Sequence, residues 1–263
     1  MDAELEIWHI AVGGISMIIL AAIMWFERLS LWKSAIVASV RMVTQLSLLG
    51  VVLDFLFASG TAWGTIGFLI LMLSVATRES VQRLTYRLQG VAYFLIPLWS
   101  LLLAALPYSV LLISVVFKPI PWYEPAIVLP IFGMILGNVM NTISLALNHC
   151  LSAVQNSAEV IEQRIALGHE FKEIMTEIRT DAVKTAMLPV INAMAVTGIV
   201  SLPGMMTGQI LAGESPGQAV RYQILIWFGI AFGAGLSCLI TLYLTEKSLV
   251  NERGLPCRLL RKG

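Results

Sequence analysis

Charged residues are scarce in this 263-residue chain, at 13% of the total, where soluble domains carry about 25%. Cysteine is rarer still, and three residues make an odd number that argues against a disulfide framework. No glycine is followed by lysine, so the phosphate-binding loop of an ATPase is missing from the chain. These absences argue against an enzyme, and we expect no nucleic acid among the partners.

Apolar residues, in contrast, make up 58% of the chain, and its mean hydropathy is +0.84. A helix needs about 20 such residues to cross the hydrocarbon core of a bilayer. Seven segments qualify: 7–26, 35–57, 61–77, 90–117, 124–147, 185–207 and 218–245. The fourth contains Pro97 and Pro107, for which we expect a kink, a tilt or a re-entrant end. The sequence predicts an all-α integral membrane protein with about seven transmembrane helices in one domain, residues 1–263.

The basic residues are distributed unevenly between the segments that separate these spans. If the amino terminus lies outside and the spans alternate, the inner segments hold 14 of the 17 lysines and arginines. Only Lys118 and Arg221 fall outside, and Arg41 lies within a span. Because lysine and arginine concentrate on the cytoplasmic side, we expect a multi-pass protein of the cytoplasmic (inner) membrane with its carboxyl terminus inside.

Residues 148–184, between the fifth and sixth spans, form the one sizeable segment outside the membrane. Two apolar stripes at helical spacing, Val154 to Ile165 and Phe171 to Ala182, predict an amphipathic cytoplasmic helical segment. Leu167 and Gly168 separate the stripes and indicate a helix stop followed by a restart. Two interpretations stay open: a hairpin lying on the membrane surface, or a coupling segment that docks a nucleotide-binding partner.

Five polar residues are candidates for a transport pathway: Arg41, Gln45, Asn138, Asn141 and Asn192. A polar group that faces lipid without a partner costs several kcal/mol, so we expect these side chains to point inward. Inward polar groups either line a pathway or form hydrogen bonds between helices. For the arginine, reaching back to the inner surface is a further alternative.

Gly133 and Gly137 stand four residues apart, a spacing that lets helices approach closely, and they predict a packing seam. The seam would lie within one chain or between two. Seven spans are few for a two-sided pathway, and twofold pairs are the commonest oligomers, so we expect a homodimer.

The end of the sixth span contains the sequence Leu202-Pro-Gly-Met-Met206. Pro203 frees a backbone carbonyl and Gly204 lowers rigidity, which favours a hinge at this point. The thioethers of Met205 and Met206 are soft ligands that a transition metal would accept near the outer mouth of a pathway. Methionine also fills gaps between packed helices, and this simpler role is the alternative.

Ser201–Gly213, followed by Arg221-Tyr-Gln-Ile224, resembles the signature of the FetB-type permeases. These are the membrane subunits of a small ABC transporter family that includes iron exporters and plant aluminium-tolerance proteins. Blocks at 41–46, 129–138 and 181–189 are similar to the same family and occur in the same order. The loop Glu162–Gly168 also resembles the segment with which ABC permeases engage their ATPase.

The resemblance implies a permease subunit of an ATP-driven exporter, with iron or a related metal ion as its cargo. It implies a cytoplasmic ABC ATPase on a separate chain, which would bind ATP and Mg, and no cofactor on this one. The coupling residues would be Glu162, Leu167, Gly168 and Phe171. A gradient-driven secondary transporter and a membrane scaffold protein are the alternatives. No internal repeat is visible and no span has a carboxylate at its centre, which argues against the first.

Overall fold

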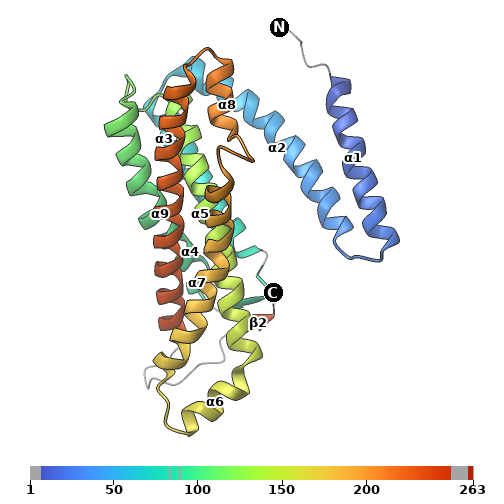
Figure 1. The fold of residues 1–263 in the computed structure, drawn as a ribbon, viewed down its shortest axis with the longest axis vertical. Helices are drawn as coiled ribbons and strands as arrows, with labels where there is room; N and C mark the ends of the chain where they lie inside the picture. The colour runs from blue at the N-terminus through green and yellow to red at the C-terminus, as the bar shows by residue number, and fades with distance from the viewer. Residues whose placement is uncertain (1–6, 83, 89, 250–259, 263) are drawn as a thin grey trace. The chain divides into compact units, whose positions relative to one another are not determined.

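The computed structural model describes residues 7–82, 84–88, 90–249 and 260–262, and most of them are helical (Figure 1). Both ends of the chain, on which the predicted orientation depends, lie outside these residues. The chain forms two compact units, Met1–Gly60 and Thr61–Gly263, and each is described by itself. The prediction of a single domain over residues 1–263 is not tested by this division.

The first unit is a pair of helices, α1 (Ile7–Phe26) and α2 (Trp32–Ser59), which pack against each other. Gly60 ends α2 in the left-handed conformation, with φ at +51°, and its N–H donates to the carbonyl oxygen of Leu56 at 3.0 Å. Glycine adopts this conformation without steric penalty, so the helix ends there.

The second unit contains seven helices, a π-helical turn and two short strands among its described residues. In chain order they are α3 (Ala62–Gln82), β1 (Tyr86–Leu88), α4 (Ala92–Leu111), η1 (Leu112–Phe117), α5 (Pro125–Asn156), α6 (Ala158–Ala166), α7 (Phe171–Val196), α8 (Gly204–Leu211), α9 (Pro216–Ser248) and β2 (Leu260–Lys262). The strands pair antiparallel, with Tyr86 opposite Lys262. Both α5 and α9 begin with proline, whose missing N–H is harmless in the first helical turn.

The core of this unit lies between α5 and α9. On each of these helices every fourth residue is buried: Ile135, Val139, Ile143, Leu147 and Leu151 on α5, and Ile226, Ile230, Ala234, Cys238 and Leu242 on α9. Residues at this spacing form a ridge that packs into the groove of a neighbouring helix. Because α5 also packs against α3, α4 and α7, it is the central helix of the bundle.

The ring of Tyr108 from α4 packs directly against the backbone of α9 at Gly229. A Cβ atom at this position would overlap that ring. The Tyr108 hydroxyl donates to the carbonyl oxygen of Leu225 at 3.2 Å, which fixes the ring over the glycine. A Cβ at Gly233, one turn further on, would meet Val139 Cγ2 at 3.0 Å.

The predicted seam at Gly133 and Gly137 is not a close helix contact within the chain. A Cβ at Gly133 would meet only the terminal methyl of Met72, at 3.0 Å, and a flexible side-chain end can move. At Gly137 no heavy atom would lie within 4 Å. A role for Gly137 in pairing two chains stays a prediction.

Five of the described helices are long and apolar enough to cross a membrane: α2, α3, α4 together with η1, α5 and α9. The shorter apolar stretch Val12–Phe26 lies within α1. The expectation of about seven continuous spans is therefore supported only in part. Pro97 and Pro107 lie inside α4 without ending it, and the chain continues into the π-helical turn η1 rather than turning back.

The sixth predicted span, 185–207, is not one helix. Helix α7 ends at Val196, residues 197–203 are irregular, and α8 begins at Gly204. Gly198 takes a φ of +91°, which a helix does not allow, and Pro203 precedes the first residue of α8. Helix α7 begins beside α6, and α8 lies at the opposite end of the bundle (Figure 1). Helix α7, the break and α8 together therefore extend from one end of the bundle to the other.

The predicted segment 148–184 is shorter as a separate element than expected. Helix α5 continues to Asn156, and α7 begins at Phe171 and runs on without interruption to Val196. Only residues 157–170 lie between the two long helices. The predicted stop and restart is confirmed: α6 ends at Ala166, and Gly168 turns the chain with φ at +95°.

Gly229→Ala is expected to destabilise the bundle by about 1–3 kcal/mol, because the added methyl group must displace the Tyr108 ring. Gly235→Ala is the matched control on the same helix, since its Cβ would meet Met187 Cε at an ordinary 3.9 Å. Thermal unfolding of the purified protein in detergent measures both. Equal melting temperatures for the two variants would contradict the proposed α4–α9 seam.

Candidate coupling surface and transport pathway

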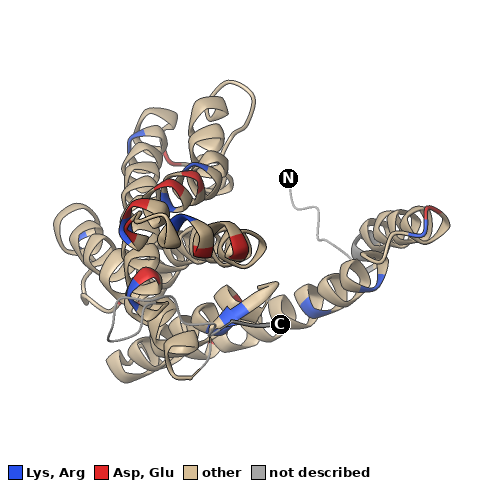
Figure 2. Ribbon diagram, turned by 90° about the horizontal axis from the view of Figure 1, so that it is seen from below, with Lys and Arg blue, Asp and Glu red and all other residues tan. Residues whose placement is uncertain are grey.

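Helix α6 and the turn after it form one end of the second unit (Figure 1). Viewed from that end, Figure 2 shows acidic and basic residues gathered on α6 and on the first half of α7. They are Glu159, Glu162, Arg164, Glu170, Lys172, Glu173, Glu177, Arg179, Asp181 and Lys184. A surface this rich in charge belongs in water, and it marks the end of the bundle that leaves the membrane.

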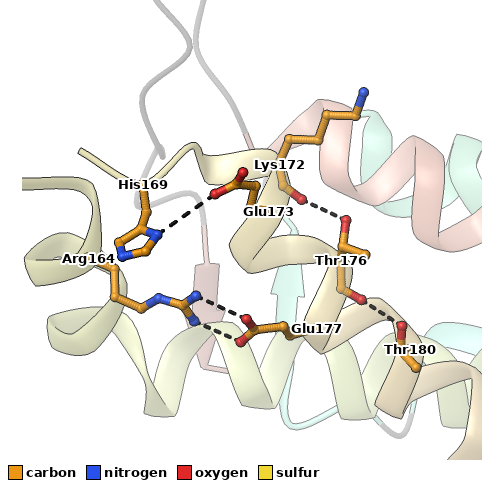
Figure 3. Close-up of polar contacts among 7 residues, drawn as sticks. All are labelled: Arg164, His169, Lys172, Glu173, Thr176, Glu177 and Thr180. Atoms are coloured by element: carbon orange, nitrogen blue, oxygen red, sulfur yellow. Dashed lines mark hydrogen bonds and ion pairs between the residues drawn. The ribbon is translucent and has the colours of Figure 1, made fainter. Parts of the chain in front are cut away.

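A buried side chain and an ion pair hold α6 against the bundle. Ile161 is buried on the inner face of α6. Arg164 binds Glu177 of α7 through two parallel hydrogen bonds, Nη1 to Oε2 at 2.7 Å and Nη2 to Oε1 at 3.0 Å (Figure 3). His169 Nδ1 lies 3.8 Å from Glu173 Oε2 and adds a contact across the turn when it is protonated.

The ion pair shifts the pKa of both partners in the direction that favours their charged forms. The hydrogen bond from Arg164 is the main cause that lowers the pKa of Glu177 below its ordinary 4.5, and the same bond raises the pKa of the guanidinium. A lowered carboxylate pKa stabilises the folded pair at neutral pH. That stabilisation is lost as the pH falls through the folded pKa of Glu177.

The four predicted coupling residues divide into exposed and internal positions. Leu167 is 80% exposed at the tip, and Glu162 is exposed on α6. Gly168 forms the turn, whereas Phe171 is half-buried and packs against the core. The turn after α6 is therefore a small projecting surface, and Leu167 is the large apolar side chain that it exposes.

Helix α7 is tied to α9 as well as to α6. Arg179 Nη1 binds Glu246 Oε2 at 3.1 Å, and this pair is less exposed than the one at Glu177. The same α7 carries Asn192 near its other end. Helix α7 thus connects the α6 end of the unit to the break at residues 197–203, with Pro189 inside it.

The predicted pathway asparagines lie where the bundle leaves α5 and α7 uncovered. Asn138 is half-buried and its Nδ2 donates to the carbonyl of Met134 in its own helix at 2.8 Å, so it does not link helices. Asn141 and Asn192 are exposed. Neither asparagine has a hydrogen bond to a residue that the structure describes. Exposed amides at membrane depth require a covering of protein or water.

Arg41 and Gln45 lie one turn apart on α2, and both are exposed. They belong to the first unit, whereas the three asparagines belong to the second. Their participation in one pathway with the asparagines stays a prediction.

The break between α7 and α8 interrupts the ladder of backbone hydrogen bonds. Gly198 N–H donates to Ser201 O at 2.8 Å, and Ser201 N–H donates to Val196 O at 3.3 Å. The carbonyl oxygens of residues 197–200 accept no hydrogen bond from the part of the chain that the structure describes. In a membrane, such backbone is tolerated only where it is covered by protein or lines an aqueous cavity.

The predicted hinge and methionines adjoin this break. Pro203 immediately precedes α8 and Gly204 is its first residue, so the two predicted hinge residues lie where the helix is interrupted. Met206 is buried and Met205 packs against the core, as gap-filling side chains do. Among the described residues, no three His, Cys, Asp or Glu side chains come together as a metal site.

Two glutamines near the methionines were not singled out by the sequence. Gln209 Oε1 on α8 and Gln223 Oε1 on α9 are buried and accept no hydrogen bond from the described residues. Trp227 Nε1, one turn beyond Gln223, is likewise buried and donates to none of them. The sequence signal that could have identified these glutamines is an amide side chain within an apolar segment. Both lie in the signature region between residues 201 and 224.

The chain matches the profile of an uncharacterised protein family, UPF0014, over residues 7–250. The UPF0014 membrane protein YjkA of Bacillus subtilis (strain 168) is 36% identical over 217 residues, which cover 82% of this chain and 84% of the relative. Escherichia coli (strain K12) has a relative named "Probable iron export permease protein FetB", 30% identical over 227 residues, 86% of this chain and 85% of that one.

A plant relative is similar over much the same length. Protein ALUMINUM SENSITIVE 3 of Arabidopsis thaliana is 28% identical over 242 residues, 91% of this chain and 86% of its own. The expected resemblance to FetB-type permeases and their plant relatives is confirmed. No solved structure matches the chain.

Glu177→Gln is expected to loosen α6, because the amide keeps the shape of the carboxylate but removes its charge and one hydrogen-bond acceptor. Backbone amides of α6 should then exchange with deuterium a few-fold faster. Acidifying the unaltered protein through the lowered pKa of Glu177 should have the same effect. The variant should respond less to acid.

Asp181→Asn is the control for this experiment, since it removes an exposed pair with Lys184 within α7 and leaves α6 untouched. Equal exchange in α6 for Glu177→Gln and Asp181→Asn would show that the Arg164 pair does not hold the helix.

Proposed function

Because the chain belongs to the UPF0014 family of membrane proteins, we propose that it is the permease subunit of an ATP-driven ABC exporter. The proposed cargo is iron or a related metal ion, as the name of the E. coli relative suggests. The structural observation that carries the proposal is the interrupted crossing formed by α7 and α8. In many transporters, substrate and ions bind where membrane helices are broken.

The chemistry of the break suits a cation. Four successive backbone carbonyls, those of residues 197–200, accept no backbone hydrogen bond from the described residues, and carbonyl oxygen is a ligand for hard cations. Thioether sulfur from Met205 is close by in the sequence for softer ions. No carboxylate or imidazole cluster competes among the described residues, which favours passage over tight storage.

The depth of the break is consistent with this role. Lys184 precedes the apolar half of α7, and Val196 ends the helix twelve residues later. At 1.5 Å per residue this places the break about 18 Å from the level of Lys184. The hydrocarbon core is about 30 Å thick. With Lys184 at the inner surface, residues 197–203 lie within the outer half of the core.

The ATPase would dock at the opposite end of the bundle, on α6, and ATP binding there would drive the movement. The exposed Leu167 would fill a pocket on a cytoplasmic ABC ATPase, which would bind ATP and Mg, and the charged residues around it would form the polar rim of the interface. Under this proposal the α6 end faces the cytoplasm of the inner membrane, as the distribution of basic residues suggests.

A second copy of the chain would complete the pathway. The exposed Asn141 and Asn192 and the open position Gly137 need a covering that excludes lipid. A homodimer that pairs across this side of α5 and α7 provides it. The mass of the detergent-solubilised protein decides the point, since a monomer that fully stimulates its ATPase would contradict the pairing.

Leu167→Asp is expected to abolish co-purification of the ATPase, because it places a carboxylate where an apolar pocket should close. Leu211→Asp is the matched control: its side chain is equally exposed, at 83% against 80%, and lies on α8 at the other end of the bundle. Phe171→Asp would be a poorer test, since Phe171 packs against the core and its loss affects folding. Retention of the ATPase by Leu167→Asp would refute the docking assignment.

ATP-dependent movement of iron(II) across vesicles containing the permease and its ATPase is the experiment that tests the function. The unaltered protein should move iron only with ATP. Asn192→Leu should reduce this movement at least tenfold with assembly intact, because it replaces an exposed amide beside the break by a side chain that offers a cation no ligand.

Ile191→Leu, at the neighbouring exposed position, is the control and should transport normally. Iron movement driven by an ion gradient without ATP would favour a secondary transporter. No movement of iron under any condition would remove iron from the proposal, and an inert complex would favour a scaffold.

A further inference from the structure

A large cavity lies in the second unit, at the end of the bundle opposite α6. Its volume is about 710 Å³, and its walls come from α3, α4, η1, the loop that follows η1, and the start of α5. Ligand pockets in proteins have volumes of about 300–1,000 Å³ and mostly apolar walls. The cavity has no part in the pathway or the coupling surface proposed above.

The walls of this cavity suit an aliphatic chain. Leu69 and Leu73 of α3 and Leu102 and Leu106 of α4 are among the lining residues. Three hydroxyl groups in the wall, those of Ser109, Ser114 and Thr65, already have partners in the protein. Ser109 Oγ donates to Ala105 O at 2.7 Å, Ser114 Oγ donates to Val110 O at 2.7 Å, and Thr65 Oγ1 donates to Tyr123 O at 3.0 Å. A ligand that needed several hydrogen bonds would gain little here.

The rim of the cavity carries one positive charge, that of Lys118. This lysine is exposed and forms no ion pair with a residue that the structure describes. It ends η1 in the left-handed conformation, with φ at +44°, a position where glycine is usual. Trp122, on the same rim, is exposed, as aromatic residues are at the boundary between lipid and water.

We propose that this cavity binds one acyl chain of an anionic phospholipid, whose phosphate pairs with Lys118. An apolar slot with a cation at its mouth is complementary to an amphiphile with a negatively charged head. The proposal depends on the membrane location of the chain and on the cavity, and is independent of which solute is transported.

Native mass spectrometry of the full-length protein in detergent tests the proposal. The probes are phosphatidylglycerol and phosphatidylcholine with identical acyl chains. The unaltered protein should bind phosphatidylglycerol more tightly. Lys118→Ala should weaken that binding about fivefold and leave phosphatidylcholine unchanged, since one basic residue near a membrane surface contributes about this factor.

Arg221→Ala is the matched control, because Arg221 is exposed near the start of α9 and does not line the cavity. It should bind both lipids as the unaltered protein does. Leu106→Trp and Val110→Trp each place an indole ring in the cavity. Because both wall positions are about half exposed, folding should be preserved. Either variant should lose the most tightly bound lipid of both kinds.

Equal affinities for phosphatidylglycerol in Lys118→Ala and Arg221→Ala would overturn the assignment of the head group. Undiminished lipid binding by both tryptophan variants would overturn the assignment of the cavity. A photoreactive side chain at position 106 supplies the remaining test. It should label lipid, and labelling of residues 1–60 or of a second copy would show that protein fills the cavity.

Discussion

Backbone hydrogen bonding in a medium without water is the constraint on which the structure depends. Every N–H and C=O group within the hydrocarbon core needs a partner in the protein, and a helix supplies these partners locally. The chain satisfies this requirement with long helices, such as the 32 residues of α5 and the 33 residues of α9. Against that background, unpaired carbonyls at residues 197–200 need a specific environment. A polar pathway or a protein cover would provide it.

The same constraint connects the two ends of the molecule. Helix α7 has 26 residues, about 39 Å in length, and runs from the coupling surface at α6 to the break, with Pro189 inside it. The Arg164–Glu177 pair attaches α6 to this helix, and the Arg179–Glu246 pair attaches the helix to α9. A partner that displaced α6 would act on this helix, and Pro189 and the irregular residues beyond Val196 are the points where the chain could bend.

Packing in the rest of the bundle limits where such movement is possible. The four-residue ridges of α5 and α9 interlock, and the Tyr108 ring lies directly on Gly229. Large relative displacement of α4, α5 and α9 would break these contacts. Asn141 of α5 and Asn192 of α7 are exposed, outside this packed core. The proposed pathway thus uses positions that the packing of the core leaves free.

The cavity beside Lys118 adds a lipid to this arrangement. It lies between α3 and α4, where Ser109, Ser114 and Thr65 already have partners, so its surface is effectively apolar. A bound acyl chain would fill space that helices of this shape leave open. It would stabilise the contacts of α3 and α4 with α5 rather than take part in transport.

The sequence by itself determined the membrane class, the charged α6 end, the turn at Leu167 and Gly168, and the family. These follow from apolar length, charge and local turn chemistry, which act over a few residues. It placed a hinge at Pro203 and Gly204 but did not predict that the helix already ends at Val196, because Ile199 and Val200 keep the segment apolar while Gly198 turns the chain. It also did not single out Gly229 and Gly233, which are tightly packed within the chain. Gly133 and Gly137 have the same spacing, and only the tertiary structure placed Tyr108 against Gly229 and Val139 against Gly233. The spacing of two glycines indicates only that a neighbouring helix can pack closely there. Whether it does depends on which side chain of the neighbouring helix lies opposite the glycines.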